Sequence, residues 1–139
     1  MTEETSGERV IADQIAYYRA RAPEYDETFG GSHDPALVAE LDALKPTGDV
    51  LELACGTGAW TEAIVRHRVG SVHCVDAAPE MLALHEQRIA DPRVTREAAD
   101  LFTWRPRRRY DLVTFGFWLS HVPPARFAAF WSAVRDALA

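Results

Sequence analysis

The amino-acid sequence predicts an α/β fold in which a doubly wound, mainly parallel sheet carries helices on both faces. Short apolar runs alternate along the chain with segments of helical periodicity, which is the pattern of parallel strands joined by crossover helices. A turn with two closely spaced glycines directly follows the first apolar run. The 139 residues contain no internal repeat and no linker, so we expect a single domain over 1–139.

Four strands are expected, at 49–53, 71–75, 94–98 and 111–115. N-terminal helices are expected over 8–22 and from 35 to 44, where Asp34 is a suitable N-cap and Pro35 a suitable first helical residue. Further helices are expected over 59–68, from Pro79 to the Asp91-Pro92 stop, and after Pro123. Residues 1–7 are expected to be disordered. The last helix should face inward with Phe127, Phe130, Trp131, Val134 and Leu138.

The composition limits the classes of partner. The net charge is −6, so the chain lacks the basic excess with which proteins neutralise nucleic-acid phosphates, and the cluster Arg105, Arg107, Arg108 and Arg109 is interpreted as a solvated loop. The acidic, polar start of the chain is unlike a signal peptide. No run approaches the ~20 apolar residues of a membrane span. Cys55 and Cys74 show no metal or disulfide spacing, so free thiols and a cytoplasmic location are expected.

Residues 50–60 read Val-Leu-Glu-Leu-Ala-Cys-Gly-Thr-Gly-Ala-Trp and predict a strand, a tight turn and a helix start. Gly56 and Gly58 can adopt positive φ, and without a Cβ they let the backbone pass close to a ligand. Glu52 is expected to point its carboxylate at the same place, which disfavours a phosphate ligand. The third glycine of a dinucleotide fingerprint is replaced by Thr61, and no P-loop lysine follows. An ordinary βα turn with incidental glycines is the alternative.

The stretch Glu52-Leu-Ala54-Cys-Gly56-Thr-Gly58 resembles motif I of class I S-adenosylmethionine-dependent methyltransferases. The resemblance implies a Rossmann-like fold of seven strands in the order 3-2-1-4-5-7-6. It also implies that the glycine turn packs against the methionine part of S-adenosyl-L-methionine, with the acid near its ammonium group. Four of the seven strands are expected here, so the chain is interpreted as truncated after the fourth strand, with an exposed edge open to self-association.

Two further acids follow the second and third expected strands. Asp76 comes twenty residues after Gly56, and a carboxylate at that place can accept from both hydroxyls of a ribose. The context Val75 to Leu82 resembles the D-x-S-x-x-M-L segment of the same family, with Ala78 where serine is common. The resemblance places Met81 over the adenine and Asp100 on its exocyclic amine. The cofactor contacts implied in this region are Asp76, Ala77, Met81, Asp100 and Leu101.

The segment after the fourth expected strand resembles motif IV, in which a D-L-V strand runs under the methyl-donor sulfur. Phe115 and Gly116 are expected near the methionine part of the cofactor. Phe117 and Trp118 are expected on the acceptor side, or else as core aromatics. His121 could serve as a general base because its ordinary pKa lies near neutrality, and it could equally be structural.

Residues 17–26 resemble a segment that lies over the cofactor cleft in small-molecule methyltransferases. Tyr18, Arg21 and Tyr25 are therefore candidates for the cofactor's carboxylate end. An amphipathic helix packing its tyrosines on the sheet is the alternative.

The sequence thus predicts S-adenosylmethionine-dependent methylation of a small molecule by SN2 transfer, without a metal. In such a reaction the protein mainly supplies proximity, alignment and exclusion of water. Two alternatives remain at this point. One is an NAD(P)-dependent oxidoreductase, against which Glu52 and Thr61 argue. The other is a non-catalytic Rossmann-like module that binds the cofactor or nothing.

Overall fold

A computed structural model describes residues 9, 12–17, 20, 35–116 and 118–139 of the chain. The expectation of disorder over 1–7 therefore lies outside the described residues. Residues 12–17 are helical, in agreement with the helix expected over 8–22. The remaining elements are the helices α3 (Pro35–Leu44), α4 (Ala59–Ile64), α5 (Pro79–Arg88) and α6 (Pro124–Ala137), the strands β1 (Gly48–Leu53), β2 (Val69–Asp76), β3 (Val94–Ala98) and β4 (Leu112–Thr114), and the short 3₁₀ helix η2 (Leu119–His121).

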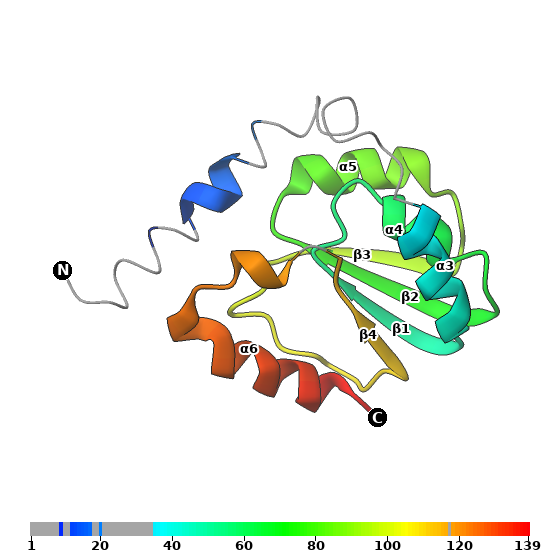
Figure 1. Cartoon of the computed structure of the whole chain (residues 1–139). Helices are drawn as coiled ribbons and strands as arrows, with labels where there is room; N and C mark the ends of the chain where they lie inside the picture. Colours follow the sequence, from blue (N-terminus) through cyan, green and yellow to red (C-terminus); the bar gives the residue numbers. More distant parts are fainter. Residues whose placement is uncertain (1–8, 10–11, 18–19, 21–34, 117) are drawn as a thin grey trace.

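The four strands form one parallel sheet in the order β3-β2-β1-β4, which confirms the predicted topology (Figure 1). Leu51 lies at the centre of the register, opposite His73 on β2 and Val113 on β4. Because all strands are parallel, their carboxyl ends share one edge of the sheet. The turn after β1 and the acids that follow β2 and β3 therefore come together there.

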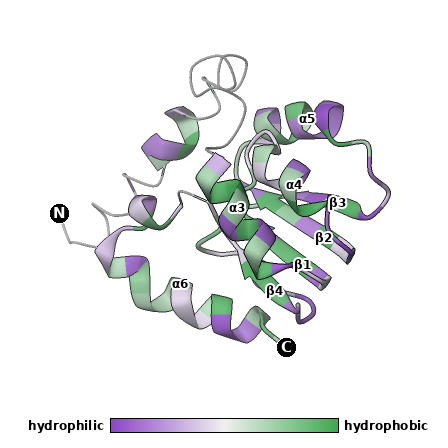
Figure 2. Cartoon of the chain, turned by 45° about the vertical axis from the view of Figure 1, so that its right-hand side comes forward, coloured by the Kyte–Doolittle hydropathy of each residue, from purple (hydrophilic) through white to green (hydrophobic). Residues whose placement is uncertain are grey.

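Helices cover both faces of the sheet, and successive residues of β1 pack into two separate hydrophobic cores, one on each face. Val50 packs with Leu41 of α3, Ile64 of α4 and Leu82 of α5 on one face. Leu51 and Leu53 pack on the opposite face, against Phe130, Val134 and Ala137 of α6. In Figure 2 the strands carry hydrophobic colour that is interrupted by hydrophilic residues. This two-sided burial is typical of parallel sheets and explains why β1 reads as a nearly continuous apolar run.

Helix α4 is shorter than the predicted 59–68, because an arginine holds the chain that follows it. The guanidinium of Arg93 donates to the carbonyl of Val65 at 2.7 Å, to that of His67 at 3.2 Å and to that of Val69 at 3.3 Å. It also pairs with Asp91. These bonds satisfy the carbonyls after the last helical turn and direct the chain into β2.

The inward face predicted for α6 is partly wrong. Phe130 and Val134 are buried, but Phe127 and Trp131 are each 42% exposed and Leu138 is 38% exposed. The helix is seated on the sheet through Phe130, Val134 and Ala137, so the side chains next to this stripe lie at its margin. The small residue Ala137 was not expected in the core, because its size gives a weak apolar signal.

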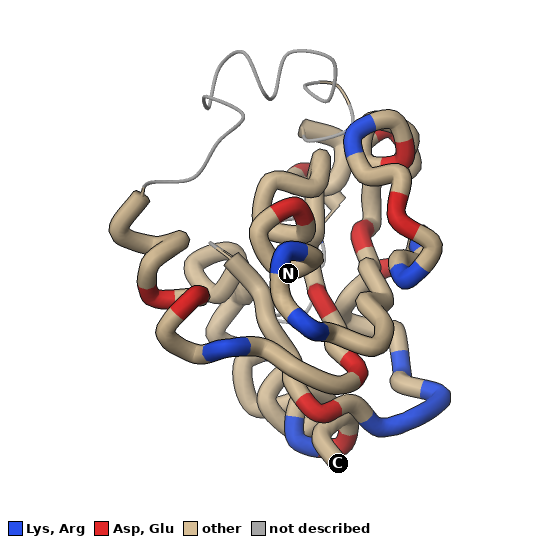
Figure 3. The backbone as a smooth tube through the Cα atoms, turned by 90° about the vertical axis from the view of Figure 1, so that its right-hand side faces the viewer, with Lys and Arg blue, Asp and Glu red and all other residues tan. Residues whose placement is uncertain are grey.

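Acidic and basic residues are distributed along the whole of the described chain (Figure 3). In the loop before β4, Arg108 forms an ion pair with Asp49, and Arg107 lies 3.8 Å from Glu97. Two of the four arginines of the basic cluster thus lie beside an acid. Among the described helices, none is both long and apolar enough to cross a lipid bilayer.

Candidate functional site

The turn between β1 and α4 has an unusual backbone. Three of its residues have positive φ: Ala54 at 55°, Gly56 at 56° and Gly58 at 100°. Gly58 is also the N-cap of α4, where it has a left-handed conformation. A side chain at Gly56 would meet no atom within 4 Å, so the backbone there borders open space. The predicted glycine turn is therefore present, and its first left-handed position is occupied by an alanine.

Asp76, the last residue of β2, fastens this turn to the start of α5. One carboxylate oxygen, Oδ2, accepts the amide N–H of Gly56 at 2.9 Å, and the other, Oδ1, accepts the amide N–H of Ala78 at 2.9 Å. Burial raises the pKa of Asp76, while the two amides oppose that shift. A carboxylate has roughly four acceptor sites, so both oxygens can still accept hydrogen bonds from a ligand.

An open cavity lies at the carboxyl ends of the strands. Its lining is mainly apolar with a few polar groups, which is typical of small-molecule sites. Its described lining residues come from the helical segment 12–17, the glycine turn, the ends of β2 and β3, the start of α5 and the segment after β4. They are Gln14, Ile15, Ala54, Gly56, Asp76, Ala77, Ala78, Met81, Asp100, Leu101, Phe102, Gly116, Trp118 and His121.

The structure thus brings together most of the residues that the sequence singled out: Ala54, Gly56, Asp76, Ala77, Met81, Asp100, Leu101 and His121. Asp100 lies in the turn after β3, where its Oδ1 accepts the amide N–H of Phe102 at 2.9 Å. That bond closes an Asx-type turn, so the aspartate both shapes the loop and lines the cavity.

Aromatic rings form the wall on the side of β4. The ring of Trp118 lies 5.5 Å from that of Phe102 and 6.3 Å from the imidazole of His121, measured between ring centroids. Gly116 leaves room for another ring, since a Cβ there would come within 1.9 Å of Nε1 of Trp60. Among the residues that the structure describes, the buried Nε1 of Trp118 has no hydrogen-bond partner.

Glu52 does not line the cavity, contrary to the expected direction of its side chain. It is 2% exposed and points into the core between the sheet and α4, where its Oε2 accepts the hydroxyl of Thr61 at 2.5 Å. Side chains alternate along a strand, so Glu52 shares the face of Val50. Burial raises the pKa of Glu52 to about 7, and the nearby charge of Asp76 adds to the rise.

Gly58 and Phe115 also lie outside the cavity lining. A Cβ at Gly58 would come within 3.1 Å of Cδ2 of His85, so this glycine allows α4 and α5 to approach each other. Phe115 packs instead on α6, with its ring 5.2 Å from that of Phe130 and 5.9 Å from that of Trp131.

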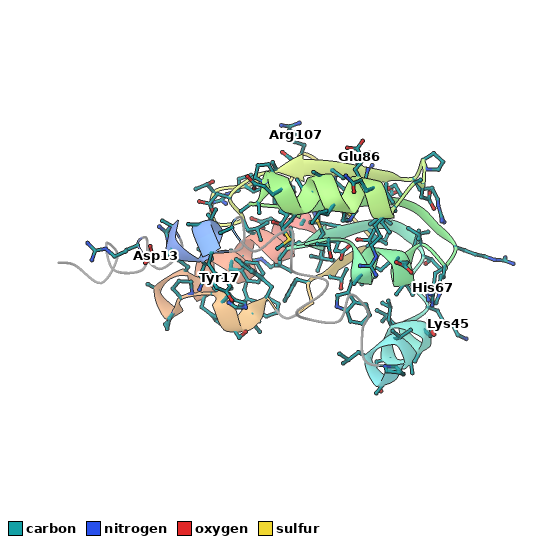
Figure 4. All side chains as sticks on the ribbon, turned by 90° about the horizontal axis from the view of Figure 1, so that it is seen from above. Asp13, Tyr17, Lys45, His67, Glu86 and Arg107 are labelled. Atoms are coloured by element: carbon teal, nitrogen blue, oxygen red, sulfur yellow. The ribbon has the colours of Figure 1, made fainter. Side chains whose placement is uncertain are left out.

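The helical segment 12–17 contributes Gln14 and Ile15 to the cavity, which the sequence reasoning did not identify. Figure 4 shows Asp13 and Tyr17 at the end of the molecule opposite Lys45 and His67, which mark the amino ends of β1 and β2. The helical periodicity of 8–22 was the one signal for this segment, and it gives no information on which residues face a ligand. Tyr18, Arg21, Tyr25 and Phe117 lie outside the described residues.

Both cysteines are free and buried, as predicted. Cys55, Cys74 and His85 bring potential metal-ligand atoms within 4.8 Å of one another. Both ring nitrogens of His85 are already hydrogen-bonded, however: Nδ1 to Arg96 at 2.7 Å and Nε2 to Thr61 at 2.9 Å. These bonds and the adjacent guanidinium disfavour a cation at this place.

The fold and the site define a doubly wound α/β domain with a cavity bordered by a glycine turn and by two acids at the strand ends. Residues 50–139 match the family described as "Methyltransferase domain". The chain belongs to this methyltransferase family.

Solved and curated methyltransferases resemble the chain. DhpI, solved as a complex with SAH, is 42% identical with a TM-score of 0.81, and the match covers 94% of this chain and 64% of DhpI. An S-adenosylmethionine-dependent methyltransferase from Mesorhizobium loti is 28% identical with a TM-score of 0.64, covering 73% of this chain and 48% of the other. Demethylmenaquinone methyltransferase of Lactiplantibacillus plantarum is 32% identical over 87 residues, which are 58% of this chain and 37% of that protein. The chain therefore spans less than two thirds of the length of these relatives.

Proposed function

We propose that this chain is the cofactor-binding part of an S-adenosylmethionine-dependent methyltransferase that acts on a small molecule. The observation that carries the proposal is the convergence of the glycine turn, Asp76 and Asp100 on one cavity at the carboxyl ends of the strands. Membership of the methyltransferase family supports it, as does the relative DhpI, which has been solved with SAH and also with SAM and HEP.

The residues of the lining support the assignment of S-adenosyl-L-methionine to this cavity. A Cβ at Gly56 would project into open space, so the glycine leaves room for a ligand against the backbone. We assign the ribose hydroxyls to Asp76 and the adenine amine to Asp100, with the backbone of Leu101 beside it. Met81 would lie on the adenine, and Ala54 and Ala77 would border the ligand.

Three predicted cofactor residues that do not line the cavity keep supporting roles in this proposal. Gly58 permits the helix start behind the ligand, and Phe115 holds the chain after β4 against α6. Glu52 would act on the ligand's ammonium group through its charge from behind the turn. Tyr18 and Arg21 are proposed from the sequence resemblance alone to cover the carboxylate end.

Bound S-adenosylmethionine supplies an electrophilic methyl group on a sulfonium centre, and SN2 transfer from it needs no metal. The residues of this chain would orient the acceptor and exclude water. Trp118 and Phe102 would form an apolar wall against the acceptor. His121, which lines the cavity, would accept the proton that an oxygen or nitrogen acceptor loses.

A small molecule is the proposed acceptor because the cavity has an aromatic wall and the chain is acidic overall. The relative from Lactiplantibacillus plantarum, named for demethylmenaquinone, is consistent with a small acceptor. A reducing cytoplasm is the proposed location, since both described cysteines are buried free thiols.

Self-association is proposed for the outer edge of β4. In the described part of the chain no strand pairs with that edge, and the exposed rings of Phe127 and Trp131 lie nearby on α6. Light scattering across a concentration series tests this proposal. A mass that rises to that of a dimer, and that falls back in Trp131→Glu, supports it; a monomer at every concentration contradicts it.

Calorimetric titration with S-adenosylhomocysteine tests the proposed function, with NADH as the control ligand. We expect saturable binding of S-adenosylhomocysteine alone, weakened at least tenfold in Asp76→Ala. Asp136→Ala serves as the matched control, because that carboxylate is 68% exposed on α6. No heat from a folded chain, or equal binding of NADH, contradicts the proposal. Binding without turnover against a set of acceptors supports the non-catalytic alternative.

A further inference from the structure

Four polar side chains, of which Arg96 is partly buried and the other three are buried, form a continuous series of hydrogen bonds behind the glycine turn. Nε of Arg96 on β3 donates to Nδ1 of His85 on α5 at 2.7 Å. Nε2 of His85 lies 2.9 Å from the hydroxyl of Thr61 on α4, and that hydroxyl donates to Glu52 on β1 at 2.5 Å. Thr61 and His85 are fully buried and Glu52 is nearly so. The series thus links four different elements across the core beneath the ligand cavity.

The chemistry of the partners fixes the direction of every bond. An arginine can only donate, so Nδ1 of His85 must be the acceptor and its proton must sit on Nε2. Nε2 then donates to Thr61, which leaves the threonine hydroxyl hydrogen for Glu52. The neutral state of the imidazole agrees with its surroundings, because burial together with Arg96 and Arg88 lowers the pKa of His85 to about 4.

Each bond in this series points from the cation toward the carboxylate. Aligned hydrogen bonds polarise one another in a low-dielectric interior, so the series favours the ionised form of Glu52. Opposing influences are present: burial and the charge of Asp76 raise the pKa of Glu52 to about 7. The groups of the described chain that face Glu52 or its partners are Cys55, Thr61, Cys74, Asp76, His85, Arg88 and Arg96.

We propose that His85 is a positioning residue for the ligand cavity: through the Thr61 hydroxyl it couples Arg96 to Glu52 and so sets the ionisation of the carboxylate behind the glycine turn. Its position against the turn supports this role. A Cβ on Gly58 would lie 3.1 Å from the His85 ring, so the imidazole packs directly beneath the turn. Arg96 is anchored in turn by the carbonyl of Ile89 at 2.6 Å. The effect on ligand binding rests on the proposed function, whereas the effect on Glu52 does not.

The first test measures Glu52 without any ligand. Carboxyl ¹³C NMR of the chain labelled at glutamate gives the titration of Glu52, assigned by its loss in Glu52→Gln. We expect His85→Leu, which keeps most of the volume but has no polar atoms, to raise the apparent pKa of Glu52 by at least about one unit, a tenfold change in ionisation. Thr61→Val should do the same. His85→Gln retains a donor for Thr61 and should restore most of the wild-type titration.

Controls separate this role from general damage to the core. Arg88→Gln removes a cation that faces His85 without bonding to it, and it should leave the Glu52 titration nearly unchanged. The double variant His85→Leu/Thr61→Val should shift Glu52 no further than either single change, since both interrupt the same series. An unchanged Glu52 titration in a folded His85→Leu chain overturns the proposal, as does a shift of equal size in Arg88→Gln.

The second test measures S-adenosylhomocysteine binding between pH 6 and pH 9. If an ionised Glu52 favours the ligand's ammonium, His85→Leu should bind about tenfold more weakly at pH 7 and approach wild-type affinity at pH 9. A loss of equal size at every pH means that His85 has a purely structural role and contradicts the coupling. Absence of binding by the wild-type chain contradicts the proposed function instead, while the NMR result for Glu52 still decides the inference.

Discussion

The carboxylate of Asp76 accepts the amide N–H of Gly56 at 2.9 Å, and this bond ties the end of β2 to the turn after β1. Its second oxygen holds the amide of Ala78 at the start of α5. One side chain therefore fixes the relative position of two segments that border the cavity. Asp76, which the sequence predicts as a ligand contact, therefore also holds the backbone of the site in place.

Asp76→Asn should lower the free energy of unfolding by about 1–3 kcal/mol. Asparagine has a single acceptor oxygen, which can accept from only one of the two backbone N–H groups. Its NH₂ group then faces the other N–H and leaves that buried donor unsatisfied. Urea denaturation followed by circular dichroism measures the change, with Asp136→Asn as the exposed control. Equal stability of Asp76→Asn and wild type would show that the two hydrogen bonds of Asp76 do not hold the turn in place.

The two turn glycines should respond differently to alanine. Gly58→Ala combines a φ of 100° with contacts of 3.1 Å to His85 and 3.2 Å to Ile89, so we expect a loss of at least about 2 kcal/mol in stability. Gly56→Ala meets no neighbour, and its φ of 56° costs about 1–2 kcal/mol at most. Thermal and urea denaturation of the two variants compare them directly.

Of the two glycine variants, Gly56→Ala should have the larger effect on ligand affinity. A methyl group at Gly56 projects into the cavity, so Gly56→Ala should weaken S-adenosylhomocysteine binding more than its small effect on stability suggests. If Gly56→Ala bound the ligand as well as wild type, the ligand would not lie against this turn.

The buried pair Glu52 and His85 should give opposite contributions to stability as pH changes. The pKa of Glu52 rises from 4.5 to about 7 on folding, so its contribution is present at low pH and is lost as pH rises through 7. The pKa of His85 falls from 6.5 to about 4, so its contribution is present above pH 6.5 and is lost on acidification toward 4. Each of these two contributions to the free energy of unfolding amounts to about 3 kcal/mol. Between pH 4.5 and pH 6.5 they change in opposite directions with pH and largely cancel.

A variant that lacks one of the two groups should show the pH dependence of stability that the other group causes. Relative to wild type, Glu52→Gln should gain stability as pH rises from 4.5 to 7, and His85→Leu should lose stability as pH rises from 4 to 6.5. Urea denaturation at intervals of half a pH unit measures both differences. Two variants whose stabilities run parallel to wild type over this range would show that neither group titrates abnormally.

The orientation of α6 can be tested with two phenylalanines of the same helix. Phe130 is 5% exposed and packs on the sheet, so Phe130→Ala should cost about 3–5 kcal/mol. Phe127 is 42% exposed, and Phe127→Ala should cost less than about 1 kcal/mol. Losses of similar size in the two variants would mean that α6 packs in a different rotation.

The strands and the glycine turn could be predicted from the sequence, and the strand order from its resemblance to class I methyltransferases. Turn chemistry is local, so Gly56 and Gly58 could be placed without a structure, and the parallel arrangement then brought Asp76 and Asp100 to the same edge. The direction of Glu52 was not predictable in this way. Both faces of β1 are buried, so its apolar run does not indicate which face an acid in it will occupy.

Contacts between distant segments were likewise beyond the sequence pattern. Gln14 and Ile15 reach the cavity from a helical segment far from the motifs, and nothing in their residue types marks them. His85 reads as a polar position on an amphipathic helix, and its role depends on Arg96, which lies on another element. The seating of α6 on Phe130 rather than Phe127 follows from the shape of the sheet it covers.

The central claim is that the cavity at the carboxyl ends of β1, β2 and β3 binds S-adenosylmethionine. Amide ¹H–¹⁵N spectra of the ¹⁵N-labelled chain, titrated with S-adenosylhomocysteine, test it most directly. We predict saturable shifts that are largest at Gly56, Ala77, Met81, Asp100 and Leu101, with little change on the distant helix α3. A folded chain whose spectrum does not change, or whose largest shifts fall on α3 or α6, would contradict the assignment of this cavity.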